Sequence, residues 1–272
     1  MIFLKAFILA VVEGITEFLP ISSTGHMVLV DAFMQLSPDE HFSKAFIVAI
    51  QLPAIMSVVV YFWAKLWPFG VDGKHLIDTI SIWVRIIIGF LPAAVMGVLF
   101  NDKIEEMMGV RVVCAALIIG GILLILIERR KHTIRHQSVA TMPIAIAFAI
   151  GVFQCLAMIP GTSRSAATII GAMLLGASRA AAAEFAFFLA IPTMLGATTL
   201  SLLKHGLDFT GEQWAVLAFG SIVSFLVAYV AVAGLMRYIQ RRDFQPFGYY
   251  RIALGLAVIA YLAVYGTAGV EV

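Results

Sequence analysis

The residues that could carry chemistry gather in two short stretches that interrupt long apolar runs. The first stretch opens with Glu13 and Glu17, whose i, i+4 spacing puts both carboxylates on one face of a helix. Two acids buried together need a proton, a bound cation or a basic partner. The alternative is that both carboxylates reach water, because residue 13 could stand near one end of its run.

The same stretch continues into a break rich in hydroxyl groups, with Ser22, Ser23, Thr24, Gly25 and His26 in succession. Free backbone N–H groups and the start of a following helix suit an anion, and phosphate above all. Glycine permits close approach of the backbone, and an imidazole can exchange a proton near neutral pH. The alternative is structural: Ser and Thr are ordinary helix caps, and a lone histidine often serves packing.

The second stretch follows Pro160 and holds Gly161, Thr162, Ser163, Arg164 and Ser165. We expect Arg164 to be the only basic residue at membrane depth. Its planar guanidinium can hold two phosphate oxygens, and the neighbouring hydroxyls can donate to the same group or cap the next helix. The alternative is an ion pair with Glu13 or Glu17, which would still bring the two stretches together.

Taken together, these side chains fit a metal-assisted phosphoryl-transfer site. Glu13 and Glu17 would hold a divalent cation, Arg164 would stabilise transition-state charge, and a serine or a water would attack phosphorus. The apolar surroundings favour a substrate with a lipid tail.

The composition defines the elements that must position these residues. Apolar residues make up 62% of the 272 residues, charged residues make up 12%, and the mean hydropathy is +1.01. A soluble domain carries about 25% charged residues, so a soluble enzyme, a disordered chain and a collagen-like fibre are excluded. The net charge of +2 gives no polycation for nucleic acid. We therefore expect an all-α integral membrane protein that contacts membrane lipid.

The apolar runs predict six spanning helices and two re-entrant hairpins. Runs 1–19 and 21–36 are separated by Pro20, and runs 140–159 and 163–177 by Pro160, so each pair is predicted to dip into the membrane and return. The remaining runs are the predicted spans, at about 43–66, 80–100, 110–128, 181–204, 212–238 and 249–267. The chain is predicted to be one membrane domain, 1–272, with halves at about 1–130 and 140–272.

The two halves show weak internal similarity. Pro20 and Ser23 precede Pro160 and Ser163 by 140 positions, and Phe46, Ala49 and Ile50 precede Phe187, Ala190 and Ile191 by 141. A hairpin followed by an odd number of spans, three, inverts the second half, which predicts an inverted-topology repeat.

The basic residues predict the orientation. With this topology, five of the 18 Lys and Arg residues lie on the face where the chain starts: Lys5, Lys44, Lys103, Arg111 and Lys204. Twelve lie on the other face, Lys131 and Arg251 among them, and Arg164 lies in the second break. The face with twelve is therefore predicted to be cytoplasmic.

The motif Glu13-Gly-Ile-Thr-Glu17-Phe-Leu-Pro-Ile-Ser-Ser-Thr-Gly-His26, with Pro160-Gly-Thr-Ser-Arg-Ser165, resembles the undecaprenyl-diphosphate phosphatase family of the bacitracin-resistance type. The resemblance covers nearly the whole chain. It implies removal of the terminal phosphate of undecaprenyl diphosphate, recycling of the carrier lipid for peptidoglycan synthesis, and a divalent cation, Mg or Ca. It also implies a bacterial inner-membrane location with the site open to the outer, periplasmic face. Ala166 departs from the family pattern, where glycine is expected.

By motif position, the resemblance assigns catalytic roles to Glu13, Glu17, Ser23, His26 and Arg164, with the two acids as metal ligands. The substrate-binding residues would be Ser22, Thr24, Gly25, Gly161, Thr162, Ser163 and Ser165. The sequence does not decide between serine and water attack, or between a monomer and a homodimer.

Two other functions compete with this interpretation. A polyprenyl-phosphate transporter or flippase could use the same headgroup site, because broken helices in inverted repeats are typical of transporters. A lipid phosphatase of the acid phosphatase superfamily also uses Ser-Gly-His and Ser-Arg elements, but its second histidine and upstream basic motif are not evident here.

Overall fold

The computed structural model describes residues 1–69, 73–106, 109–130, 133–205 and 208–265. Within these ranges the regular structure is helical, and the only bridge pair is His136 with Ala177. The helices are α1 (Ile2–Thr16), α2 (Ser23–Phe33), α3 (Glu40–Ala49), α4 (Gln51–Tyr61), α5 (Trp63–Leu66), α6 (Gly73–Glu106), α7 (Val110–Arg129), α8 (Ile144–Gln154), the 3-10 turn η1 (Cys155–Met158), α9 (Arg164–Leu174), α10 (Arg179–His205), α11 (Gly211–Tyr238) and α12 (Gln245–Tyr265).

Six helical segments are long and apolar enough to cross a membrane, which confirms the predicted multi-pass, all-helical class. They are Glu40–Tyr61, Gly73–Phe100, Val110–Arg129, Arg179–Leu200, Gly211–Tyr238 and Gln245–Val264. Helices α3 and α4 together make the first of these, with their junction at Ile50.

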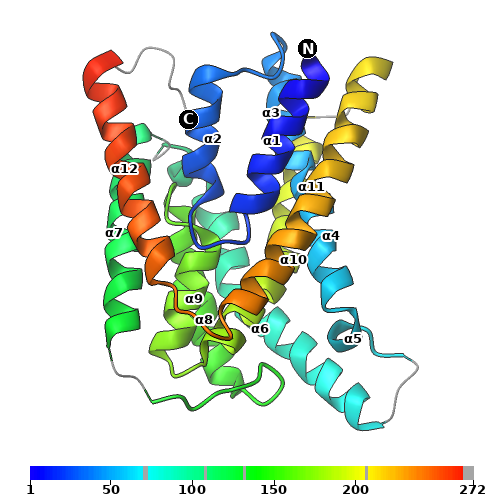
Figure 1. Ribbon diagram of the computed structural model, residues 1–272. Coiled ribbons are helices and arrows are strands. Elements are labelled where there is room, and N and C mark those ends of the chain that lie inside the picture. The colour runs from blue at the N-terminus through cyan, green and yellow to red at the C-terminus, as the bar shows by residue number, and fades with distance from the viewer. Residues whose placement is uncertain (70–72, 107–108, 131–132, 206–207, 266–272) are drawn as a thin grey trace.

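Four helices near the two sequence breaks are shorter. Helices α1 and α2 contact each other in the upper half of the molecule, and the loop that joins them reaches the middle (Figure 1). Helices α8 and α9 contact each other in the lower half (Figure 1). The two breaks lie side by side, because Ser165 at the start of α9 donates a hydrogen bond to the carbonyl of Leu19 in loop 17–22.

Small residues allow the shorter helices to approach their neighbours closely. Helix α1 packs on α11, where a Cβ at Gly14 would lie 3.0 Å from the backbone of Ser224 and Ala228. Helix α8 packs on α6, where a Cβ at Gly151 would overlap the carbonyl of Gly89. Close backbone approach at small residues is the usual way that helices pack within lipid.

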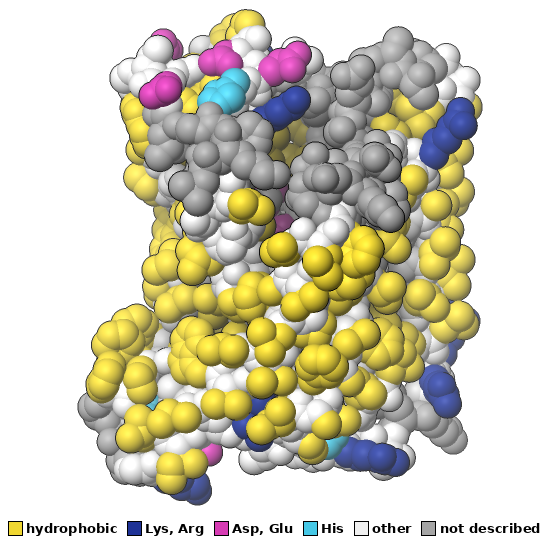
Figure 2. Space-filling view, turned by 180° about the vertical axis from the view of Figure 1, so that it is seen from behind, with side chains coloured by type: hydrophobic (Ala, Val, Ile, Leu, Met, Phe, Trp, Pro, Cys, Tyr) yellow, Lys and Arg dark blue, Asp and Glu magenta, His cyan; other side chains and the backbone are white. Residues whose placement is uncertain are grey.

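The surface separates apolar from charged side chains. Figure 2 shows a broad hydrophobic belt, with Lys and Arg side chains gathered at the lower end of the molecule. Lys131 and the side chains of Lys103 and Lys204, which entered the charge count, lie outside the described residues. Arg251 was counted at the cytoplasmic face, and this was wrong. Its side chain is fully buried, because four backbone carbonyls surround its guanidinium.

A buried carboxylate joins three segments at the lower end. Glu128 of α7 accepts hydrogen bonds from Arg179 of α10, with a shortest distance of 2.6 Å, and from the backbone N–H of Phe244 at 2.9 Å. The carboxylate of Glu128 is inaccessible to solvent, whereas the side chain of Arg179 is 39% exposed. Nearby, Lys65 and Glu184 form a second ion pair at 2.5 Å.

We predict that Glu128→Gln lowers the free energy of unfolding by about 1–3 kcal/mol, because it weakens several charge-assisted bonds but leaves Arg179 partly hydrated. Thermal or denaturant unfolding in detergent measures the loss. Glu40→Gln is the matched control: it removes the Glu40–Lys44 pair, which is 3.9 Å apart and exposed. The control should change stability by less than about 0.5 kcal/mol, and equal effects of the two changes would contradict the prediction.

Candidate functional site

Glu17 joins the two sequence breaks. Its Oε1 lies 3.4 Å from Nη2 of Arg164, and its Oε2 accepts a 2.7 Å hydrogen bond from the hydroxyl of Ser23. The side chains of Glu17 and Arg164 are only 10% and 11% exposed. The structure therefore brings together an acid, a hydroxyl and a guanidinium from positions up to 147 residues apart. The ion pair considered as an alternative for Arg164 is present.

The guanidinium of Arg164 keeps an unused donor. Its Nη1 donates to the carbonyl of Ala186 at 2.9 Å, and its Nη2 contacts Glu17 and the sulfur of Met194. Its Nε is buried and has no hydrogen-bond partner within the described parts of the chain. A buried N–H donor without an acceptor is costly, so this atom suits an anion that enters the site.

Glu13 is the most isolated acid of the site. It is 1% exposed, so it does not reach water, and Gln51 and Glu17 are its polar neighbours. Neither of its carboxylate oxygens has a hydrogen-bond partner among the residues that the structure describes. Orphaned carboxylate oxygens in the interior are what a bound cation would satisfy. The described residues contain no group of three or more His, Cys, Asp or Glu side chains that could hold a metal ion.

Two serines cap the N-termini of the helices that follow the breaks. The Ser22 hydroxyl accepts from the N–H of Gly25, and the Ser163 hydroxyl accepts from the N–H of Ala166, each at 3.3 Å. Both serines have positive φ, at 72° and 69°, a strained conformation for a residue with a side chain. The capping alternative is thus correct for these two residues.

The two helix caps pair differently from the serines matched in the sequence, and the shift is one residue. Ser163 corresponds to Ser22, not to Ser23, because the second loop has one more residue between its proline and its cap. The spacing of 141 that relates Phe46 to Phe187 also relates α2 to α9 at both ends.

Other hydroxyls tie the breaks together. Ser165 donates to the carbonyl of Leu19 at 2.9 Å and lies 3.0 Å from the Ser163 hydroxyl. Thr24 and Thr162 are half-buried. Gly25 fits closely against α7, because a Cβ there would lie 3.0 Å from Leu117.

Gly161 and Ala166 occupy special positions in the second break. Gly161 has φ +88°, and a Cβ there would lie 2.6 Å from the carbonyl oxygen of Val113. Ala166 stands where the resemblance predicts glycine. It contributes its backbone N–H to Ser163, and its methyl group is buried. The departure therefore leaves the helix cap intact.

His26 bonds to a residue that the sequence did not single out. Its Nδ1 lies 2.7 Å from the carbonyl oxygen of Ser22, and its Nε2 lies 2.7 Å from the hydroxyl of Tyr250. A carbonyl only accepts, so Nδ1 carries the proton, and in the neutral ring Nε2 accepts from Tyr250. The two rings are nearly parallel, with an interplanar angle of 7° and centroids 5.5 Å apart.

Tyr250 and Arg251 are neighbours in the second turn of α12, and sequence reasoning missed both. Arg251, rather than Arg164 alone, is a buried basic residue close to the breaks. The available signal was its position within the predicted apolar run 249–267, in a helix that begins six residues earlier at Gln245. It was assigned to the interface because it stands near one end of that run.

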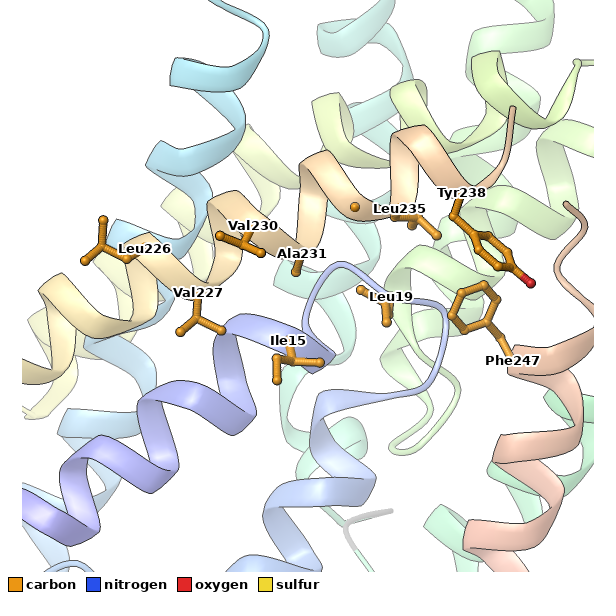
Figure 3. Close-up of a pocket in the computed structure, with 10 residues that line it drawn as sticks. Ile15, Leu19, Leu226, Val227, Val230, Ala231, Leu235, Tyr238 and Phe247 are labelled. Atoms are coloured by element: carbon orange, nitrogen blue, oxygen red, sulfur yellow. The ribbon is translucent and has the colours of Figure 1, made fainter. Parts of the chain in front are cut away.

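An apolar groove lies beside the first break. Figure 3 shows Ile15 and Leu19, from the end of α1 and the loop after it, facing side chains of α11. Tyr238 and Phe247 close one end, and the groove has a volume of about 580 Å³. Leu19 lines the groove with its side chain, while its carbonyl accepts from Ser165 in the polar site.

These features define a multi-pass helical membrane protein with a buried polar site made by two broken-helix loops. Residues 6–257 match the family described as bacitracin resistance protein BacA, so the chain belongs to that family. The chain is 50% identical over 260 residues to "Undecaprenyl-diphosphatase 1" of Clostridioides difficile, covering 94% of this chain and 95% of the relative. It is 49% identical over 268 residues to "Undecaprenyl-diphosphatase" of Enterococcus faecalis, covering 96% and 97%. It is 51% identical over 264 residues to "Undecaprenyl-diphosphatase" of Fusobacterium nucleatum, covering 94% and 98%.

We predict that Ser22→Ala and Ser22→Gly differ in stability. Alanine loses the cap and keeps the strained φ, so it should lower the free energy of unfolding by about 1 kcal/mol. Glycine also loses the cap but removes the strain, so it should stay within about 0.5 kcal/mol of the unmodified protein. Thermal unfolding in detergent compares the two variants. Equal losses would show that the positive φ stores no strain.

Proposed function

We propose that this chain is an undecaprenyl-diphosphate phosphatase, which releases the terminal phosphate of undecaprenyl diphosphate and regenerates undecaprenyl phosphate. The observation that carries the proposal is the Ser23–Glu17–Arg164 arrangement across the two breaks. It is supported by the printed names of relatives about half identical over nearly the whole chain. This activity recycles the carrier lipid for peptidoglycan synthesis and explains resistance to bacitracin.

In the proposed mechanism, Arg164 binds the diphosphate through its free Nε–H and its forked terminal nitrogens. The Ser23 hydroxyl attacks the terminal phosphorus while its proton passes to Glu17, 2.7 Å away. The bond from phosphorus to the bridging oxygen breaks, and undecaprenyl phosphate leaves. Water then hydrolyses the phosphoserine. If water instead attacks directly, Glu17 takes the proton of that water, and Ser23 donates to the phosphate.

A divalent cation, Mg or Ca, fits the acidic half of the site. Glu13 and Glu17 would hold it, because the Glu13 oxygens are otherwise unsatisfied in the interior. When bound, the ion would neutralise charge on the phosphate oxygens. Two carboxylates leave room for water and phosphate oxygens to complete its coordination, as is usual for Mg.

His26 has a defined part in this proposal. Its Nδ1 is committed to the Ser22 carbonyl, so only Nε2 can receive a proton, and the Tyr250 hydroxyl stands directly at that atom. Proton exchange between the site and His26 would therefore pass through Tyr250. The remaining hydroxyls of the breaks, Ser165 among them, would keep the loops in place around the headgroup.

The groove beside the first break suits part of the substrate's tail. Its lining is mostly aliphatic and aromatic, and Leu19 belongs to this lining through its side chain and to the polar site through its carbonyl. An undecaprenyl chain is much longer than a membrane leaflet is thick, so it must bend or lie along the protein.

We also propose that each half is a re-entrant hairpin plus three spans, related by inverted repetition. The packing supports this: α1 contacts α11 as α8 contacts α6, and α4 contacts α11 as α10 contacts α6. Helices α2 and α9 have equal length, and the serine that caps each of them has a similar positive φ. The protein would lie in the bacterial inner membrane, with the first hairpin and the site open to the periplasm.

We predict opposite faces for two exposed positions, Glu40 and Ser138. Single Glu40→Cys and Ser138→Cys variants, in a background with Cys114 and Cys155 replaced by alanine, should react from the periplasm and the cytoplasm, respectively. A membrane-impermeant thiol reagent on intact cells and on inverted vesicles distinguishes the faces. Reaction of both positions from one side would overturn the proposed topology.

We predict that Glu17→Ala and Arg164→Ala each reduce phosphate release more than about tenfold, a barrier increase above about 1.4 kcal/mol. The assay is release of phosphate from undecaprenyl diphosphate by purified protein in detergent, with and without a chelator. Chelation should also reduce the rate. Either variant keeping more than about a tenth of the activity would overturn the site assignment.

Two further experiments separate the alternatives. In liposomes, movement of the lipid to the other leaflet without phosphate release would support the transporter. Trapping of a phosphoserine would establish attack by serine.

A further inference from the structure

Arg251 is a buried cation whose hydrogen bonds converge from three segments. Its Nη2 donates to the carbonyl oxygens of Ala116 and Gly161 at 3.0 and 3.1 Å. Its Nε donates to Leu117 at 3.3 Å, and its Nη1 donates to Pro20 at 3.4 Å. Ala116 and Leu117 belong to α7, whereas Pro20 and Gly161 belong to the first and second breaks. One side chain therefore links both breaks to α7.

All four acceptors of Arg251 are neutral backbone carbonyls. The ion pairs found among the described residues do not include Arg251, whose side chain has no solvent exposure. A buried guanidinium must have its donors satisfied, and carbonyl groups in a broken helix need donors that lipid cannot supply. The guanidinium and the two loops thus satisfy each other.

The surrounding glycines leave the space that this arrangement needs. A Cβ at Gly120 would overlap Nη2 of Arg251. At Gly161, φ is +88°, and a Cβ would lie 2.6 Å from the backbone oxygen of Val113. Both positions admit the guanidinium and the second break only because a side chain is absent.

The bonded carbonyls lie close in sequence to the proposed catalytic groups. Pro20 stands three residues from both Glu17 and Ser23, and Gly161 stands three residues before Arg164. The 3.4 Å contact between Glu17 and Arg164 joins the same two loops, but its two side chains must also be free to engage substrate. A separate link through the backbone can hold the loops while that contact rearranges.

We infer that Arg251 is a positioning residue that holds the two breaks in register, so that Ser23 and Glu17 of one face Arg164 of the other. Its effect on turnover rests on the proposed phosphatase function. Its effect on the two loops does not, and can be measured without any activity.

The test uses the full chain in detergent, with Arg251→Lys and Arg251→Gln. A lysine keeps the charge but offers one donor group, which cannot reach all four carbonyls. We expect backbone hydrogen exchange to accelerate at least about tenfold in segments 17–23 and 159–165 together, while the rest of α7 and α12 changes little. We expect kcat to fall at least about tenfold, with KM changing less than about threefold.

Two further variants make the outcome decisive. Gly120→Ala displaces the guanidinium without removing it and should accelerate exchange in the same two segments. It therefore replaces Arg251→Gln as the test if that variant does not fold. Arg129→Gln is the matched control. Arg129 also links α7 to α12, through Tyr249 at 2.7 Å, but does not touch the breaks, so it should leave exchange in both loops unchanged.

Acceleration spread over α7 and α12, or confined to one loop, would mean general destabilisation and would overturn the inference. Unchanged exchange in both loops with Arg251→Lys would also overturn it. If the unmodified protein releases no phosphate, the proposed function fails, and the exchange data still decide the role of Arg251.

Discussion

The structure depends on one constraint: a helix broken inside lipid exposes backbone groups and charges that lipid cannot solvate. The polar contacts near the two loops satisfy such groups. Serine caps satisfy the first N–H groups of α2 and α9, Ser165 satisfies the Leu19 carbonyl, and Arg251 satisfies carbonyls of both breaks. Among the described residues, the buried groups left without a partner include both Glu13 carboxylate oxygens and Nε of Arg164, which are then available for a ligand.

Much of this could be predicted from sequence because lipid imposes simple rules. Charged residues are scarce, so Glu13, Glu17 and Arg164 stand out within apolar runs, and prolines mark the breaks. The six apolar spans follow from the length and composition of the runs. Even the contact between Glu17 and Arg164 was anticipated as an alternative, since opposite charges at the same depth tend to pair.

The rest depended on information that the order of residues does not contain. Arg251 lies near one end of an apolar run, and such a residue normally extends its side chain to water. Only the position of the two loops, set by packing of distant helices, supplies the carbonyls that bury it. Tyr250 meets His26 for the same reason, across 224 residues. Matching the two prolines also paired the wrong serines, because the second loop has one extra residue between its proline and its serine cap.

The equivalence of Ser22 and Ser163 has a consequence for how the site is shared between the halves. At the same spacing, Glu13 corresponds to Gln154, Glu17 to Met158 and Ser23 to Arg164. Gln154 is also buried, with an oxygen that lacks a partner within the described part of the chain, but it carries no charge. In the proposed repeat, the two halves would therefore differ in electrostatic sign. One loop is acidic and the other basic, so a diphosphate would encounter two different ends, and an asymmetric ligand would have one preferred direction between them.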